Sequence, residues 1–101
     1  MKKSSLILGP GEFLGMEYHS GYKRYYVFGT NPADMFKRVI QMYNSYAGNK
    51  YNKKQFTDIC KEEGHSCFLY KFNIGSVFSF DDDCYSMGEL GGTQIKDWKP
   101  Y

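Results

Sequence analysis

The segment that decides the fold is NPADMFKRVIQMYNSYAG, residues 31–48, which predicts an amphipathic helix. Asn31 can cap the helix, Pro32 suits its first position, and Asp34 favours the positive end of the helix dipole. Gly48 can end the helix. Between these ends, apolar side chains recur at three- and four-residue spacing and form one stripe of Phe36, Val39, Ile40, Tyr43 and Ala47. We expect this stripe to pack on a β-sheet.

Short strands and a second helix are predicted around this helix, because aromatic and β-branched residues favour strands and Gly marks the turns between them. Before the helix we expect either a short strand or an apolar plug at residues 6–8, and then strands at 12–19 and 22–28 joined as a hairpin. After it we expect a second helix at 53–63 and strands at 67–73 and 76–80. Residues 93–98 predict either an edge strand or a tail anchored by Trp98. The chain, 1–101, therefore predicts a single α+β domain. Its small antiparallel sheet has about four to five strands, in the order β-β-α-α-β-β, with two helices packed on one face.

Aromatic side chains outnumber branched aliphatic ones in this chain. The sequence contains ten Tyr and eight Phe, but Leu, Ile and Val together number only 13. We expect a core built largely from aromatic rings, in which each buried Tyr needs a hydrogen-bond partner. Since ten hydroxyls are difficult to satisfy inside one small domain, several Tyr should lie at the surface, where they often mark a contact site. The alternative is a half-exposed sheet face that carries Tyr as a common strand residue.

Charge is distributed unevenly along the sequence. Residues 1–61 carry ten Lys and Arg against four Asp and Glu, whereas residues 62–101 carry three Lys against seven Asp and Glu. The net charge of the whole chain is only +2. The asymmetry predicts either one basic and one acidic contact face, or a mixture of the two once the halves fold together.

Cysteine usage and the lack of an export signal favour a reducing compartment. Cys60, Cys67 and Cys84 cannot all pair within one chain, and the apolar stretch after Lys2 and Lys3 is too short for a secretion signal. No apolar run reaches the length of a membrane span. We expect a cytoplasmic protein without membrane contact, in the host cytoplasm if a phage encodes it.

Reactive residue types occur in three patterns, none of which predicts catalysis or metal binding. One set of possible zinc ligands lacks the close Cys-x2-Cys pair of zinc sites; it consists of Cys60, His65, Cys67 and Cys84. The acidic run at 81–83 lacks the alternate spacing of a calcium loop and predicts a solvated turn, with mimicry of nucleic-acid phosphate as a weaker alternative. His65 and Cys67 could share a strand face, but no third orienting group accompanies them. We expect no enzyme activity, metal or cofactor.

Two segments interleave cations with aromatic rings and predict a binding surface. They are Lys23-Arg24-Tyr25-Tyr26 and Lys50-Tyr51-Asn52-Lys53-Lys54, and Lys37-Arg38 could extend the patch. Cations neutralise phosphates and exposed rings stack on bases, so direct binding of RNA or DNA fits this pattern, as does a solvated basic surface with Tyr in the core. The candidate binding residues are Tyr22, Lys23, Arg24, Tyr25, Lys37, Lys50, Tyr51, Lys53 and Lys54.

Roughly residues 18–72 resemble the GIY-YIG nucleases. Tyr26-Val27-Phe28-Gly29-Thr30-Asn31-Pro32, with Arg38 six residues later, looks like the second strand and the arginine-bearing helix of that family. The chain departs from the family pattern where Gly15-Met16-Glu17-Tyr18 replaces the first signature, where Phe28 interrupts the second, and where Met42 stands at the usual histidine position. The resemblance implies a degenerate relative without nuclease activity.

Small size, missing catalytic motifs, many tyrosines and bipolar charge favour a small non-enzymatic protein that binds and blocks another macromolecule. Small phage proteins that inhibit bacterial defences, CRISPR inhibitors included, look similar, so a phage-type, anti-CRISPR-like inhibitor is the leading hypothesis. Its partner would be a protein or a protein–nucleic-acid complex. The alternative is a module that binds RNA or DNA directly through its Lys, Arg and Tyr patches, and the third hypothesis is the inactive GIY-YIG-like relative.

All three cysteines are predicted to be free thiols, because their number is odd and no export signal is recognised. Titration of the denatured protein, prepared without reductant, should find three thiols per chain. A single thiol per chain would mean that a disulfide forms and would contradict the expected reducing compartment.

Overall fold

The structure is a computed structural model that describes residues 5–8, 11–20, 24–74, 78–81, 87–89 and 91–100, and the side chains of these residues except at 5–8, 74 and 78–81. The elements in chain order are β1 (Ser5–Leu8), β2 (Gly11–His19), β3 (Arg24–Gly29), α1 (Pro32–Ala47), α2 (Lys53–Glu63), β4 (Ser66–Ile74), β5 (Phe78–Asp81) and β6 (Thr93–Gln94). The predicted α+β class is confirmed, and β1 and β6 add short strands to the predicted order β-β-α-α-β-β.

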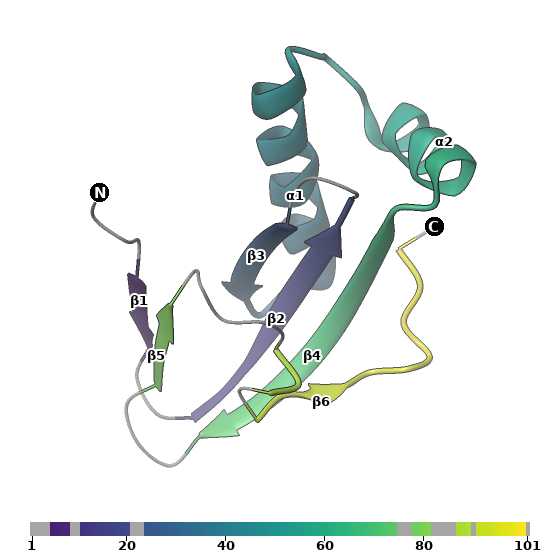
Figure 1. The fold of residues 1–101 in the computed structure, drawn as a ribbon. Coiled ribbons are helices and arrows are strands. Elements are labelled where there is room, and N and C mark those ends of the chain that lie inside the picture. Colours follow the sequence, from purple (N-terminus) through teal and green to yellow (C-terminus); the bar gives the residue numbers. More distant parts are fainter. Residues whose placement is uncertain are drawn as a thin grey trace.

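β2 is the central strand of the main sheet, which has the antiparallel order β3-β2-β4-β6 (Figure 1). It forms the predicted hairpin with β3 and pairs with β4 along its whole length. The outer edge of β4 accepts β6 opposite Tyr70 and Lys71. The sheet therefore unites strands that lie far apart in the sequence.

β5 departs from the expectation of a single sheet. It pairs with β1 in a separate two-stranded antiparallel sheet, from Ser5↔Asp81 to Leu8↔Phe78. One edge of β4 is paired with β2 and part of the other with β6, whereas β5 pairs with β1. This pairing joins segments about 70 positions apart in the sequence and has no local sequence signal.

α1 begins and ends where its sequence predicts. The Oδ1 atom of Asn31 accepts hydrogen bonds from the backbone N–H groups of Ala33 and Asp34, and Gly48 ends the helix with a φ of 71°. The buried face includes Phe36, together with Met35, Val39 and Ile40. Ala47, predicted at the end of the stripe, is exposed because the last turns of α1 extend beyond β3 (Figure 1).

α2 is held by a capping box at its start. The Asn52 side chain accepts from the Gln55 backbone, and the Gln55 side chain accepts from the Asn52 backbone. Gly64 ends the helix with a φ of 73°. Phe56 and Cys60 are buried as predicted. Within the described part of the chain, neither helix is long and apolar enough to cross a bilayer.

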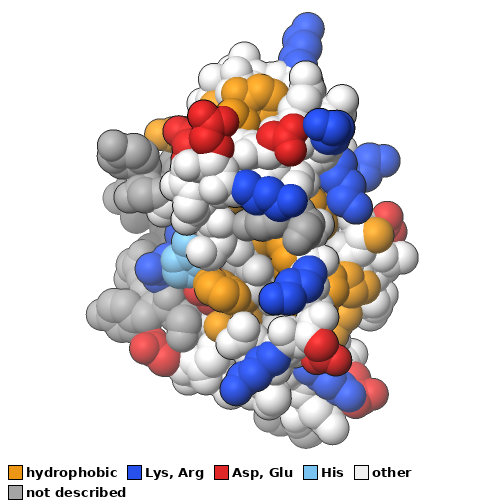
Figure 2. Space-filling view, turned by 90° about the vertical axis from the view of Figure 1, so that its right-hand side faces the viewer, with side chains coloured by type: hydrophobic (Ala, Val, Ile, Leu, Met, Phe, Trp, Pro, Cys, Tyr) orange, Lys and Arg blue, Asp and Glu red, His pale blue; other side chains and the backbone are white. Residues whose placement is uncertain are grey.

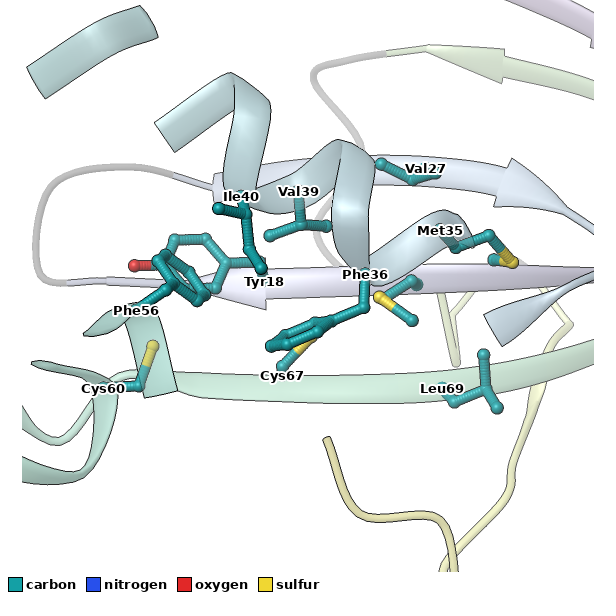
Figure 3. Close-up of a cluster of buried hydrophobic side chains, with 11 residues drawn as sticks. Tyr18, Val27, Met35, Phe36, Val39, Ile40, Phe56, Cys60, Cys67 and Leu69 are labelled. Carbon is teal, nitrogen blue, oxygen red and sulfur yellow. The ribbon is translucent and has the colours of Figure 1, made fainter. Parts of the chain in front are cut away.

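The main core lies between the two helices and one face of the sheet (Figure 3). Tyr18 and Phe56 are fully buried there, and their ring centroids are 5.6 Å apart. Phe36 packs edge-on to Phe56 at 5.7 Å. Aromatic rings thus join β2, α1 and α2, as the composition predicts.

The opposite face of the sheet is also partly covered. Met87 and Phe72 are fully buried on this face. A Cβ atom at position 15 would lie only 2.6 Å from the Sδ atom of Met87, so Gly15 leaves the space that Met87 occupies. Glu17, which is 2% exposed, accepts the backbone N–H of Met87 at 2.9 Å. The turn at 87–89 is therefore fastened to the central strand.

Truncation of Phe56 is predicted to destabilise the fold more than truncation of an exposed ring. Phe56→Ala removes a fully buried side chain between two helices and should lower the free energy of unfolding by about 3–5 kcal/mol. Tyr46→Ala, at a side chain with 58% exposure, should change it by less than about 0.5 kcal/mol. Urea denaturation followed by circular dichroism measures both. Equal effects of the two substitutions would contradict the packing described for α2.

Candidate functional site

A groove runs along one side of α1, between that helix, the start of α2 and the segment after β6. It is lined by residues of α1 between 31 and 44, by residues 51–53 and by residues 98–100, and its volume is about 770 Å³. This set of residues is called the lysine groove below. Its volume lies within the range of about 300–1,000 Å³ typical of ligand pockets.

The wall at residues 51–53 is fixed by two hydrogen bonds from α1. The Nδ2 group of Asn44 donates to the Tyr51 carbonyl at 3.0 Å, and its Oδ1 atom accepts from the Tyr51 N–H at 3.2 Å. The Tyr51 ring stacks on Tyr43 with centroids 6.2 Å apart. Because backbone and ring are both held, this side of the lysine groove is preformed.

The segment after β6 forms the other wall. Its backbone is attached to β4, because the Ile95 backbone N–H donates to the Leu69 carbonyl at 2.8 Å. The segment then turns at Trp98, whose backbone N–H donates to the Ile95 carbonyl at 3.3 Å. The half-buried Trp98 ring packs edge-on against Phe36, with centroids 6.5 Å apart. The sequence offered an edge strand or a tail anchored by Trp98, and the structure contains both.

Three lysines, from three separate elements, line this groove and give it a positive charge. They are Lys37 of α1, Lys53 at the start of α2, and Lys99 after β6. No carboxylate lines the groove, and none of the three forms an ion pair, among the residues that the structure describes. On the side that carries α2 and the C-terminal segment, Lys and Arg side chains stand beside hydrophobic patches (Figure 2).

At both helix starts that border the groove, a cap occupies backbone N–H groups. The Oδ1 atom of Asn31 occupies the N–H groups of Ala33 and Asp34, and that of Asn52 occupies the N–H group of Gln55. A phosphate usually binds helix starts through such N–H groups. Attraction of anions to this groove therefore depends mainly on the lysine side chains.

The predicted binding residues of the second basic segment divide between the groove and the adjacent surface. Lys37, Tyr51 and Lys53 line the groove. Lys50 is exposed but does not line it, and Lys54 forms an exposed ion pair with Asp58 at 3.0 Å. The sequence thus identified three of the groove residues, although they were predicted as part of a broader patch.

The first basic segment lies elsewhere in the fold. Arg24 donates to the Tyr26 hydroxyl at 3.4 Å, on the face of the sheet opposite the helices. The Tyr25 side chain points to the other face of the sheet, which carries the helices, and its ring packs against the main core. Tyr22 and Lys23 lie outside the described residues. Neither Arg24 nor Tyr25 lines the groove.

The aromatic ring of Tyr25 is largely occupied by packing. It stacks on Tyr18 with centroids 5.6 Å apart, and its hydroxyl is buried without a hydrogen-bond partner among the described residues. Burial raises the pKa of this hydroxyl above its ordinary value. A nucleobase therefore has little access to the Tyr25 ring.

Sequence reasoning missed Trp98 and Lys99 as site residues. Trp98 was considered only as an anchor, and Lys99 lies in the acidic half of the chain. The signal that could have found them is the Trp98-Lys99-Pro100 segment itself, because tryptophan beside a cation is typical of binding surfaces. Trp98 and Lys99 meet there with side chains of residues 31–53, which are more than 40 positions away in the sequence, so only the fold unites them.

The two described cysteines are buried, and the two half-buried histidines are hydrogen-bonded to neighbouring side chains. Cys60 and Cys67 are free thiols, and burial raises the pKa of each to about 12. The Tyr18 hydroxyl is hydrogen-bonded to Nδ1 of His65 at 2.6 Å, and Nε2 of His19 is hydrogen-bonded to the Glu17 carboxylate.

No group of three potential metal ligands comes together within the part of the chain that the structure describes. Two of the residue sets considered from the sequence are incomplete there, because Cys84 and residues 82 and 83 lie outside it.

Comparison with protein-family models, with curated proteins and with solved structures finds no match to this chain. The residues that carry the GIY-YIG resemblance lie on β3 and α1, where Arg38 donates its Nη2 group to the Phe28 carbonyl at 2.6 Å. The guanidinium thus fastens α1 to β3 in this fold.

The stability of the fold is predicted to fall in alkaline solution. The buried thiols of Cys60 and Cys67 keep their protons more strongly in the folded state than in the unfolded chain. Above the ordinary thiol pKa of about 9, the unfolded chain therefore loses these protons first, and the free energy of unfolding falls as the pH rises towards about 12.

Urea midpoints at about pH 8 and about pH 10 measure this loss. A Cys60→Ala, Cys67→Ala double variant should lose less stability than the wild type over the same interval. Equal losses in the two proteins would show that other groups cause the pH dependence.

Proposed function

We propose that this protein is a non-enzymatic binding protein that holds a segment of another protein in the lysine groove and thereby blocks that partner. The observation that carries the proposal is a preformed groove of about 770 Å³ with an apolar floor and three lysines without ion pairs among the described residues. Such a site combines buried apolar contact with charge selection, which is how many protein interfaces achieve affinity and specificity.

The floor of the groove supports a protein ligand rather than a nucleic acid. Ile40 and Pro32 contribute aliphatic surface, which suits apolar side chains of a partner better than polar base edges. Trp98 supplies a large, partly exposed ring of the type that dominates binding energy at protein interfaces.

The distribution of the basic residues supports the same proposal. Binding of single strands usually needs a continuous cationic track beside exposed rings. Here Arg24 lies on the sheet face opposite the helices, the Tyr25 ring is packed in the core, and Lys54 is paired with Asp58. Of the predicted cations, Lys37 and Lys53 line the lysine groove.

Direct binding of RNA or DNA is the second candidate function. It is favoured by Tyr51 and Trp98, two half-buried rings that line the groove beside the three lysines. A base could stack on such a ring while lysines neutralise the adjacent phosphates.

Blocking follows if the partner needs the captured segment for its own contacts. A phage-type inhibitor of a bacterial defence complex would act in this way, in the cytoplasm of the host. The buried, free thiols of Cys60 and Cys67 are compatible with that compartment.

Charge reversal in the groove tests the proposed function. Lys37→Glu combined with Lys53→Glu should abolish capture of the protein partner from nuclease-treated lysate of the source cells, because both substitutions place carboxylates in the lysine groove. Lys61→Glu, on the exposed last turn of α2, changes the same kind of charge outside the groove and should leave capture intact.

Gel retardation of single-stranded RNA and DNA by the same proteins distinguishes the two candidate functions. The proposal predicts only weak binding, with a Kd of about 10⁻⁴–10⁻⁶ M, as for any basic surface. Tight, salt-sensitive retardation that disappears in the double variant, with no protein captured, would favour the nucleic-acid function and overturn the proposal.

A further inference from the structure

We propose that the ligand of the lysine groove is an acidic protein segment, about six residues long and extended, in which carboxylates alternate with large apolar side chains. This inference rests on the function proposed above. It follows from the length of the groove, from the position of its charges and from the polar groups that its walls offer.

The length of the groove is set by α1. Its lining residues on this helix extend from 31 to 44, and at 1.5 Å per residue they span about 20 Å. An extended chain advances about 3.3 Å per residue, so about six residues cover that distance.

The charges of the groove match an alternating pattern. Lys37, Lys53 and Lys99 come from three elements around an apolar floor that includes Phe36 and Ile40. In an extended segment successive side chains point to opposite sides. One row of side chains can therefore enter the floor while the other row carries carboxylates to the lysines around it.

The walls also offer hydrogen bonds that an extended backbone requires. The caps of α1 and α2 use the Oδ1 atoms of Asn31 and Asn52, and the Nδ2 groups make no further hydrogen bond among the described residues. Gln41 adds an exposed amide on the α1 wall. These groups can pair with N–H and C=O groups of an extended ligand, whereas a helix satisfies its own backbone.

Carboxylates suit this site better than phosphates. The Asn31 cap occupies the Ala33 and Asp34 N–H groups of α1, and the Asn52 cap occupies the Gln55 N–H group of α2, so a phosphate would find fewer of the backbone donors that usually bind it. Flexible lysines remain, and they pair with single carboxylates spaced along a peptide.

The fluorescence of Trp98, the single tryptophan of the chain, reports on the groove directly. The probe is the blocked hexapeptide acetyl-Asp-Phe-Asp-Leu-Asp-Phe-amide, which is too short to form a stable helix. Titration of the full chain with this peptide should shift the Trp98 emission in a saturable way. A peptide with Asn in place of Asp should bind at least about tenfold more weakly, because loss of about 1.4 kcal/mol of charge pairing corresponds to a factor of ten.

Two variants make the test specific to the groove. Lys37→Glu with Lys53→Glu should weaken binding of the acidic peptide by at least about tenfold, and Lys61→Glu should leave it unchanged. A circular-dichroism melt confirms that each variant is folded. Equal binding of the acidic and neutral peptides, or equal binding by the groove and control variants, would overturn the inference.

The outcome also separates this inference from the function on which it rests. Suppose that the Lys37→Glu, Lys53→Glu variant no longer captures the protein partner, but the acidic hexapeptide does not shift the Trp98 emission of the wild type. The proposed function then stands, and the inference of an extended acidic ligand is wrong. If a six-nucleotide oligothymidylate shifts the Trp98 emission at lower concentration than the acidic peptide, both the ligand and the proposed function are wrong.

Discussion

Burial of Tyr18 at the centre of the domain is the constraint on which the rest of the structure depends. Its ring contacts Tyr25 of β3, Tyr43 of α1 and Phe56 of α2, with centroids between 5.6 and 6.2 Å away. A buried phenol also needs a hydrogen-bond partner, and the Tyr18 hydroxyl finds it in His65, just before β4. One side chain therefore ties the hairpin, both helices and the third long strand into a single arrangement.

The position of the lysine groove follows from this arrangement. Phe56 contacts Tyr18 on one side and Phe36 on the other, and Phe36 in turn contacts Trp98 in the groove. The floor is thus continuous with the core, and Asn44 fixes the adjacent wall through two hydrogen bonds. A site held in this way loses less conformational entropy when a ligand binds than a site that has to be ordered first.

The helices could be predicted from local signals in the sequence, whereas the pairing of distant segments could not be predicted. Asn31, Gly48 and the apolar spacing define α1 without reference to the rest of the chain. By contrast, β1 pairs with β5, and nothing in either segment specifies the other. The groove is non-local in the same sense, since Lys37, Lys53 and Lys99 meet only after folding. Adjacent residues can also separate: Arg24 and Tyr25 point to opposite faces of β3 because side chains alternate along a strand.

Site-specific photocrosslinking tests the central claim most directly, namely that the lysine groove holds a segment of another protein. A benzophenone amino acid replaces Gln41, on the α1 wall of the groove, or Tyr46, which is exposed on α1 outside it. After irradiation in the source cells, the account predicts an adduct from position 41 that protease digests and nuclease does not, and no adduct from position 46. An adduct at position 41 that nuclease removes, or a protein adduct formed only at position 46, would contradict it.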